Sequence, residues 1–589
     1  MFALPFALAD AAAVLLIAVP WLWPLTWGPL SATEPYLIAA VSAALLLAYL
    51  PWRGARQAFT LAALGWLLAA ALNGGIALLQ YFHRESRGWP WINQSSTGMG
   101  FGNLRQPNLL ATHLVIGLLA LWWLARTWRR SGAWDALWGE SRAWGASWMA
   151  LLSTLLALLL LAGLAASASR VGMVEIVVVA LALTYWAWRS EAAQTAGTLG
   201  AAEAAPDRTR PSRWPGVAAL ALALAVVALY LVAVWLLPLA LRDAEGLAGR
   251  NLVDRWEHAE STCGSRLILW RDVLWLIAQK PLTGWGWGNL AWAHYAAPYE
   301  DVGLPRFCHI LDNAHNLPLH LAVTLGVPAA LAIGALTLWL IWRGRPWRET
   351  DPARQLAWGV LLAIGIHSLV EYPLWYGPFQ IAALLSLWLL WATRRRVAAA
   401  DVPQVERAAP WCSALALVLL MFVGYAGWDY WRIGQLFLAQ EDRAPEFRQN
   451  TLQQAQRSWL FQGIVGFADI TTRPITRENA ADTLTEALDT LHFSPEPRVI
   501  EKVIESATLL GEDGMAEEQL ARFRAAFPKE HRAWVESNRR RAEQARCQLT
   551  QTPPERAADS VKLPCPTGSA TSSGEDDEDE ATEDDSSAD

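Results

Sequence analysis

The chain has 589 residues, 54% of them hydrophobic, and a mean hydropathy of +0.21. Ordinary soluble domains are about 45–50% apolar, so an ordinary soluble fold is disfavoured. The formal net charge is −7, but segment 575–589 alone holds ten carboxylates, so the rest of the chain is slightly basic. Its basic residues form no patch interleaved with aromatics, which argues against nucleic-acid binding.

Long apolar segments recur along the chain, and most are long enough to cross about 30 Å of hydrocarbon as a helix. Tryptophans gather near their ends, as in an interfacial belt. We expect an all-α polytopic membrane protein with about eleven transmembrane helices. They are predicted at residues 3–20, 35–50, 59–81, 108–125, 147–166, 171–188, 216–240, 319–341, 356–371, 377–392 and 411–427.

Arginine is distributed very unevenly between alternate loops. Eighteen Arg lie in one set, at 51–58, 126–146, 189–214, 343–355 and 393–410. Only four lie in the other set, at 21–34, 82–107, 167–170 and 371–376. Because cytoplasmic loops retain Lys and Arg, the N-terminus is predicted to be cytoplasmic. An odd number of spans then places the large loop 242–318 and everything after about 428 outside.

Three domains are expected: a membrane body at 1–430, a helical region at 431–545 and an acidic tail at 546–589, predicted to be disordered. Apolar positions at helical spacing in 431–545 indicate short amphipathic helices in series. The region could be tetratricopeptide-like, although no clean 34-residue period fits. It could dock a protein partner or cap the membrane body.

Four of the five cysteines fall in segments predicted to face outward. Cys263 and Cys308 share the large loop, Cys547 and Cys565 lie in the C-terminal tail, and Cys412 lies at the cytoplasmic end of a span. Since disulfides form in oxidising compartments, we predict the pair Cys263–Cys308 and a second pair Cys547–Cys565. The alternative is four unpaired thiols.

Ionisable residues inside the predicted spans share one side of the membrane. Such residues are expensive in hydrocarbon and are functional candidates by default. All of them lie within about two helical turns of the predicted outer face, and a polar cavity that opens outward explains this bias. They are His113, Arg170, Glu175, His320, His367 and Glu371.

Two segments at this face carry positive charge. The first ends in Arg105-Gln106-Pro107-Asn108, where a helix N-terminus and Arg105 could receive an anion. An interfacial cap with a snorkelling arginine is the alternative. The second is the tight turn at Ser169-Arg170, whose guanidinium can grip phosphate oxygens bidentately. It could also be a topology or headgroup residue.

Two further segments complete the set. The large loop contains Arg266, at the start of a predicted surface helix 265–279, and His315 just before the next span. A neutral histidine can take a proton from a hydroxyl, although a loop histidine is often structural. The last segment is Glu371-Tyr372-Pro373-Leu374-Trp375-Tyr376, whose aromatics could also serve only as interface anchors. No zinc-spaced cluster, H-E-x-x-H or G-x-S-x-G motif is present, so metal and serine hydrolysis are disfavoured.

The four segments together resemble a known family. Asn103-Leu104-Arg105-Gln106-Pro107-Asn108, Ser169-Arg170, Asn313-Ala314-His315-Asn316 and Glu371 to Tyr376 occur in this order. The pattern is similar to the bacterial O-oligosaccharyltransferases that glycosylate pilin, within the O-antigen ligase and O-antigen polymerase superfamily. The resemblance covers residues 1–430, most strongly 100–380.

This resemblance implies a GT-C-like membrane fold in the bacterial inner membrane, which takes a glycan from undecaprenyl diphosphate at the periplasmic face. It implies no metal and no cofactor. The essential histidine of the family matches His315, and its phosphate-binding arginine matches Arg170, with Arg266 at a ligase-type position. Its important glutamine and tyrosine match Gln106 and Tyr372, with Tyr376 as the alternative. Some relatives have a second histidine where this chain has Asn313.

We therefore expect His315 to be catalytic. The residues expected to bind substrate are Arg105, Gln106, Asn108, Arg170, Arg266, Glu371, Tyr372 and Tyr376. The acceptor is a Ser or Thr of pilin or another exported protein, or alternatively the lipid A core or a glycan, as in a ligase or polymerase. Rivals of other classes are a transporter of lipid-linked oligosaccharide and a non-catalytic membrane scaffold.

Overall fold

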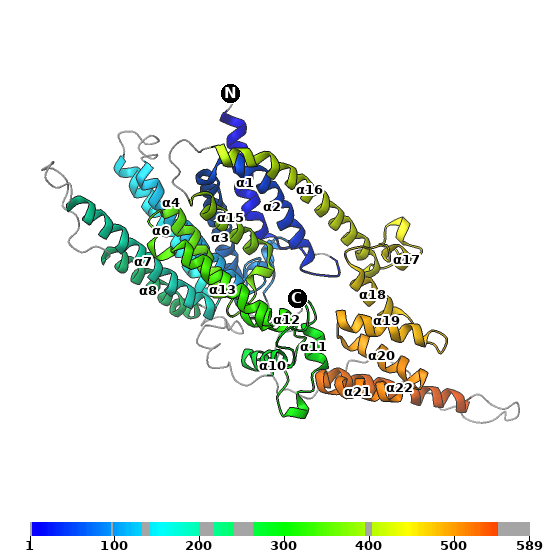
Figure 1. Cartoon of the computed structure of the whole chain (residues 1–589). Helices are drawn as coiled ribbons and strands as arrows, with labels where there is room; N and C mark the ends of the chain where they lie inside the picture. The colour runs from blue at the N-terminus through cyan, green and yellow to red at the C-terminus, as the bar shows by residue number, and fades with distance from the viewer. Residues whose placement is uncertain are drawn as a thin grey trace. The chain divides into compact units, whose positions relative to one another are not determined.

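The computed structural model describes residues 3–26, 28–95, 98–131, 142–199, 217–240, 263–394 and 403–551. Every regular element in these ranges is a helix, as Figure 1 shows, so the predicted all-α fold is confirmed. The chain divides into two compact units. The first comprises Met1–Thr262, Asn313–Ala322 and Val327–Phe461, and the second comprises Cys263–Asp312, Val323–Gly326 and Gln462–Asp589. Residues 431–461 thus group with the membrane helices, whereas loop 263–312 groups with the C-terminal helices.

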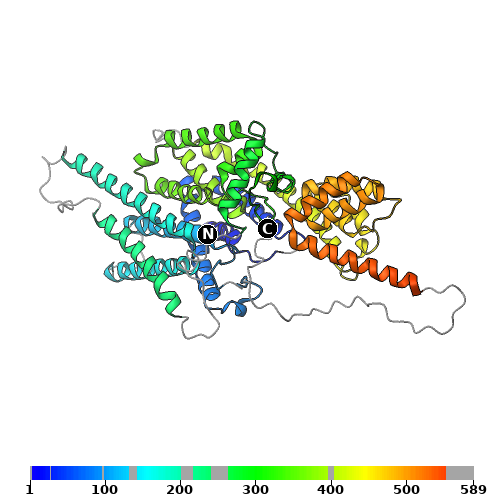
Figure 2. The ribbon, with the colours of Figure 1, turned by 90° about the horizontal axis from the view of Figure 1, so that it is seen from below.

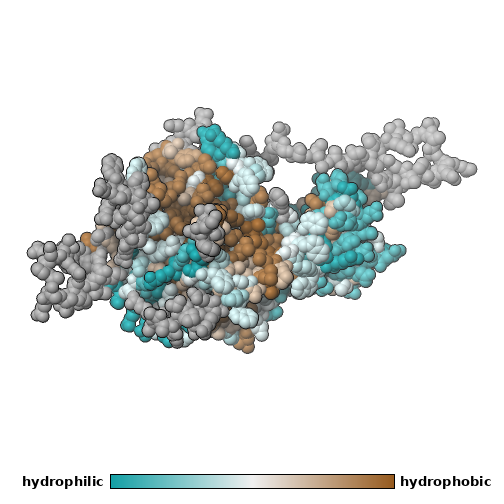
Figure 3. All heavy atoms as spheres, turned by 90° about the horizontal axis from the view of Figure 1, so that it is seen from above, coloured by the Kyte–Doolittle hydropathy of each residue, from teal (hydrophilic) through white to brown (hydrophobic). Residues whose placement is uncertain are grey.

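Eight helices of the first unit are long and apolar enough to cross a membrane, counting only the described residues. They are α2 (Thr33–Arg53), α3 (Ala55–Tyr81), α4 (Pro107–Ser131), α6 (Arg142–Ala166), α7 (Arg170–Leu199), α8 (Val217–Leu239), α13 (Val327–Gly344) and α16 (Pro403–Gly434). Two shorter apolar stretches are Ala7–Leu22, within α1 (Ala3–Leu22), and α15 (Gly377–Ala392). Brown, apolar side chains cover a broad face of this unit in Figure 3.

Two predicted spans differ from the helices that form. Span 319–341 is broken into α12 (Leu317–Leu325) and α13, because Gly326 between them has a φ of +87°. Span 356–371 corresponds to α14 (Pro352–His367), which has 16 residues and therefore a length of about 24 Å. It is not among the helices with the length and apolarity of a span, and its buried face includes Gln355 and His367.

The core of the first unit is built from small residues that let helices approach closely. A Cβ on Gly163 of α6 would lie 2.9 Å from the Cα of Gly74 on α3. A Cβ on Gly65 of α3 would lie 2.9 Å from the carbonyl oxygen of Val14 on α1. Close backbone approach of this kind is typical of helices that associate in lipid. Helix α4, which carries part of the site described below, packs on α3.

Contacts within the first unit define its two ends. At one end, Asn103 Nδ2 donates to the Leu22 carbonyl at 2.8 Å, and the Tyr430 hydroxyl donates to the Leu30 carbonyl at 2.7 Å. At the other end, Trp52 Nε1 donates to Ser413 Oγ at 3.2 Å. The start and the end of α16 therefore lie at opposite ends of the unit. We call the end with Asn103 and Tyr430 the site end.

The second unit joins the large loop to the C-terminal helices. From the loop come α10 (Arg266–Gln279) and α11 (Leu290–Ala296), with a disulfide between Cys263 and Cys308. Side by side in Figure 2 lie the later helices, which are α18 (Gln462–Thr472), α19 (Ala480–Phe493), α20 (Pro497–Leu510), α21 (Asp513–Ala526) and α22 (Pro528–Gln551). Tyr295 of α11 is buried among them and donates to Gln519 Oε1 at 2.9 Å. Cys547 lies in α22, but Cys565 and the tail 552–589 lie outside the described part of the chain, so the predicted pair Cys547–Cys565 stays a prediction.

Candidate active site

His315 stands at the site end in a strained turn that precedes α12. Its φ is +46°, and its backbone N–H donates to Asn313 Oδ1 at 3.0 Å. Its ring Nδ1 lies 2.7 Å from Glu371 Oε2. The His315 side chain is 22% exposed, whereas that of Glu371 is 1% exposed. The carboxylate is thus buried behind a histidine that still reaches the surface.

The partner of Nδ1 decides which tautomer His315 adopts. An ionised carboxylate can only accept, so Nδ1 carries the proton and donates it to Glu371. The lone pair then lies on Nε2, at the opposite edge of the ring. The ring of Tyr372 meets the imidazole edge to face, with centroids 4.8 Å apart. Tyr372 in turn stacks on Tyr376, at 5.9 Å between ring centroids.

The second oxygen of Glu371 connects two other predicted segments to the histidine. Asn108 Nδ2 donates to Glu371 Oε1 at 3.2 Å, and the Ser169 hydroxyl donates to Asn108 Oδ1 at 2.8 Å. Ser169 Oγ also accepts the backbone N–H of Gly172 at 3.1 Å. The beginning of α4, the α6–α7 turn and the segment after α14 therefore meet behind His315. We call Asn108, Ser169 and Glu371 the outer tier.

Backbone strain is concentrated around this cluster. Among the described residues, six that are not glycine have a positive φ, and three of them belong to the site segments. These three are Arg105 at +62°, Ala168 at +48° and His315 at +46°. Side chains rarely tolerate this conformation, and such strain tends to persist where function requires it.

The arginines predicted to bind phosphate are distributed over both units. Arg105 is exposed at the site end and donates to the Pro24 carbonyl at 3.0 Å. Arg170 is exposed as the first residue of α7, directly after Ser169 of the outer tier. Gln106 is half-buried just before α4. Arg266 begins α10 in the second unit. Two exposed guanidiniums thus flank the segments that converge on His315.

Three residues of the cluster had no assigned role in the sequence. Asn313 attracted attention only because it replaces a histidine, yet its side chain holds the His315 backbone. The Ser169 hydroxyl bonds to Asn108, and buried Thr112 on α4 bonds to Glu175 and His367. A hydroxyl four residues after Asn108, on the same face of the helix, was the available signal for Thr112.

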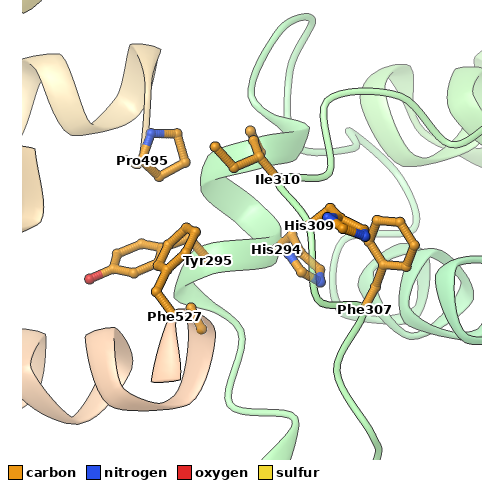
Figure 4. A pocket seen from close by; sticks show the side chains of 9 residues that line it. His294, Tyr295, Phe307, His309, Ile310, Pro495 and Phe527 are labelled. Atoms are coloured by element: carbon orange, nitrogen blue, oxygen red, sulfur yellow. The ribbon is translucent and has the colours of Figure 1, made fainter. Parts of the chain in front are cut away.

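A second polar group is buried in the second unit, beside a small aromatic pocket. In Figure 4, His294, Phe307 and His309 line one side of this pocket, and Tyr295 and Phe527 line the other. Asp272 is fully buried; it accepts the Phe307 N–H at 2.8 Å and lies 3.4 Å from His294 Nε2. Burial holds the pKa of His294 below its usual value, although Asp272 acts in the opposite direction.

Comparisons with known proteins cover each segment of the site. The O-antigen ligase family matches residues 155–334, and the protein glycosylation ligase family matches residues 101–125. The C-terminal family of virulence-factor membrane-bound polymerases matches residues 355–542. A general O-oligosaccharyltransferase of Acinetobacter baylyi is 25% identical over 371 residues, which is 62% of this chain and 56% of that protein. The alignment thus spans little more than half of that relative.

The matched ranges contain the clustered residues in the predicted order. Asn108 falls in the first range along the chain, His315 in the second and Glu371 in the third. The families agree with the resemblance carried by the sequence motifs, and the apolar helices agree with a multi-pass membrane protein. The chain is thus similar to the O-antigen ligase superfamily and to its protein O-oligosaccharyltransferases.

Proposed function

We propose that the protein transfers a glycan from undecaprenyl diphosphate to an acceptor hydroxyl at the periplasmic face of the bacterial inner membrane. The acceptor is a Ser or Thr of pilin or another exported protein. The contact between His315 Nδ1 and Glu371 Oε2, at 2.7 Å, is the observation that carries this proposal. It supports a neutral histidine whose Nε2 can accept a proton, which is what a hydroxyl nucleophile needs.

The proposed reaction is a single displacement at the anomeric carbon. The acceptor oxygen bonds to this carbon while the bond from the carbon to the diphosphate oxygen breaks. The hydroxyl proton passes to His315 Nε2, and the electron pair of the broken bond leaves with the diphosphate. Glu371 stabilises the imidazolium that forms, as the carboxylate of a Ser-His-Asp triad does.

The arginines have an electrostatic role in this proposal. Arg105, Arg170 and Arg266 bind the diphosphate and stabilise the charge that develops on it. Gln106, Tyr372 and Tyr376 orient the donor or acceptor by hydrogen bonds and ring contacts. Diphosphate is a good leaving group, so the step needs no metal and no acid. The burial of Glu371 favours a positioning role for this residue, in place of the substrate contact expected from the sequence.

The main alternative within the same chemistry concerns the acceptor. A ligase would use a lipid A core sugar as acceptor, and a polymerase would use another glycan. The matches to O-antigen ligases and to membrane-bound polymerases support these two acceptors as alternatives. A transporter of lipid-linked oligosaccharide would need polar groups along a path through both membrane halves. The convergence of polar side chains behind His315 favours a transferase.

One experiment separates these functions. The full chain is expressed in a host that supplies a lipid-linked glycan together with pilin and lipid A core, and the labelled acceptor is identified. We expect labelled pilin or another exported protein, and no label with His315→Ala at equal expression. His83→Ala is the matched control, because His83 is also a loop histidine with positive φ in the first unit. Normal transfer by His315→Ala would refute the assignment.

A further inference from the structure

Three buried side chains from three helices meet about one helical turn inside the outer tier. The hydroxyl oxygen of Thr112 on α4 lies 2.8 Å from Glu175 Oε1 on α7 and 2.7 Å from His367 Nδ1 on α14. All three residues have no measurable solvent exposure. They cannot touch a substrate, so any contribution to transfer must act through the residues in front of them. We call Thr112, Glu175 and His367 the inner tier.

The two tiers are joined along the same helices. Asn108 and Thr112 are four residues apart on α4, and Thr112 Oγ1 lies 3.2 Å from the Asn108 carbonyl. His367 and Glu371 are also four residues apart, and the Glu371 backbone N–H donates to the His367 carbonyl at 2.9 Å. The α7 segment likewise supplies Ser169 to one tier and Glu175 to the other. A shift of the inner tier would therefore be passed to Asn108 and to Glu371 itself.

Hydrogen-bond donors are scarce in the inner tier. Thr112 is the only hydrogen-bond partner of the Glu175 carboxyl among the described residues, and Glu175 Oε2 has none. Thr112 has a single hydroxyl hydrogen and three possible acceptors, which are the Asn108 carbonyl, Glu175 and His367, so it can donate to only one of them. An ionised carboxylate that is buried among apolar helices and has one hydroxyl as its hydrogen-bond partner is strongly disfavoured. A neutral carboxylic acid removes this cost and supplies the missing donor.

We propose that the inner tier is a neutral, directed hydrogen-bond chain that positions the outer tier for catalysis. The Glu175 carboxyl group donates to Thr112, and Thr112 donates to Nδ1 of His367. The two shortest contacts of the Thr112 hydroxyl, at 2.8 Å to Glu175 and 2.7 Å to His367, then each have one donor and one acceptor. Glu175, Thr112 and His367 are positioning residues. They hold the first turn of α4 and the end of α14 so that Asn108 and Glu371 stay fixed behind His315. This role rests on the proposed glycan transfer.

The first test compares variants that keep the hydrogen-bond chain of the inner tier with variants that interrupt it. Thr112→Ser keeps the hydroxyl, and Glu175→Gln keeps a donor toward Thr112, so both should transfer at near wild-type rates. Thr112→Val and Glu175→Leu break the chain. They should lower kcat about 10–100-fold, the usual cost of losing a supporting side chain, with little change in KM for the lipid-linked donor. Thr184→Val is the matched control, because the Thr184 hydroxyl bonds only to its own helix, at the Ala180 carbonyl.

Three outcomes of this first test would overturn the proposal. One is a wild-type kcat in Thr112→Val. Another is a loss of activity explained by the fraction of folded protein, as measured by size-exclusion chromatography. The third is a Glu175→Gln variant as impaired as Glu175→Leu, which would mean that the negative charge of Glu175 is what matters.

The second test does not require transfer. Infrared spectra of the full protein in detergent should contain the stretching band of a protonated carboxyl group that is lost in Glu175→Gln. The band should move to higher frequency in Thr112→Val, because the carboxyl group loses its hydrogen-bond partner. No such band would refute the neutral chain. A normal band in a protein that labels no acceptor would refute the proposed function but would still support the neutral hydrogen-bond chain of the inner tier.

Discussion

At the scale of single residues, the outer tier gives a loop histidine the support that a catalytic base needs. A carboxylate at Nδ1 fixes the tautomer and stabilises the imidazolium, while the exposed edge of the ring stays available. Glu371 is held in turn by Asn108, and Asn108 by Ser169. Since each partner is itself bonded, the His315 ring has little freedom to rotate.

Glu371→Gln should separate this support from the histidine itself. Glutamine keeps the size of the side chain but removes the negative charge that fixes the tautomer and stabilises the imidazolium. We expect kcat for transfer to fall about 10²–10⁴-fold with normal expression, by analogy with the loss of a triad carboxylate. The control is Glu349→Gln. Glu349 lies outside the site segments, and its carboxylate pairs with Arg354 at 2.6 Å. Equal kinetics for the two variants would contradict the positioning role of Glu371.

Sequence patterns identified many of the individual residues of the site, but they did not identify which of these residues contact one another. Glu371 stood out because polar residues at membrane depth are costly, whereas His315 and Asn108 stood out through the motif segments that resemble the family. The pairing of His315 with Glu371 spans 56 positions, and no local spacing encodes it. The sequence also could not tell a substrate ligand from a buried support, which depends on the exposure of each side chain. Glu371 and the hydroxyls of Ser169 and Thr112 show this limit.

At the scale of elements, the break between α12 and α13 shows how a single residue shapes the segment after His315. Residues 319–341 are continuously apolar enough to predict one helix, since hydropathy carries no information on backbone direction. The chain turns at Gly326 because the backbone of Leu282 lies against it. That contact comes from residues more than forty positions away, so the pattern of residues 319–341 could not predict it.

Gly326→Ala should therefore be destabilising. Alanine would have to adopt a φ of +87°, and its Cβ would collide with the Leu282 carbonyl. We expect a loss of about 1–3 kcal/mol in stability, measured by thermal unfolding, and weaker transfer. Gly334→Ala is the matched control, because a Cβ at this helical glycine meets nothing within 4 Å. An equal unfolding temperature for both variants would show that Gly326 is not required by the turn.

The disulfide of the large loop should stabilise the second unit. It closes a loop with a sequence separation of 45 between Cys263 and Cys308. Removing it with Cys263→Ala and Cys308→Ala together should cost about 2–4 kcal/mol of stability, since the unfolded loop gains freedom. Cys412→Ala should have little effect. Mass mapping without reductant that finds Cys263 and Cys308 as free thiols would contradict the pairing.

The second unit should also lose stability in mild acid. Burial lowers the pKa of His294 in the folded state, so the unfolded chain binds a proton more readily there. The contribution of His294 is complete above its unfolded pKa of about 6.5, and it is lost progressively as the pH falls from there through the lowered folded pKa. Thermal unfolding between about pH 7.5 and about pH 5.5 should show a smaller decrease for His294→Gln than for wild type. The control is His309→Gln, at an exposed histidine beside the same pocket, which should behave like wild type. If the unfolding temperature of His294→Gln decreases as much as that of wild type, His294 is not the cause.

At the scale of the whole molecule, the first unit is organised by its two ends. The loops predicted to be poor in arginine include those that carry Asn103, Ser169 and Glu371, and these residues belong to the site end or to the outer tier. The end of α16 is bonded to the same end through Tyr430. Charge distribution and helix contacts are independent observations, and both place residue 430 on the side of the site segments.

This organisation predicts where the chain leaves the membrane. A phosphatase fused after Gly434 should be active in the periplasm, whereas the same enzyme fused after Ala400 should be inactive, because α16 separates the two positions. A fusion after Gly54, at the end of α2 opposite the site, should also be inactive. Activity after Ala400 with none after Gly434 would reverse the orientation. The site segments, including the one with His315, would then face the cytoplasm, and transfer at the periplasmic face would be ruled out together with the topology.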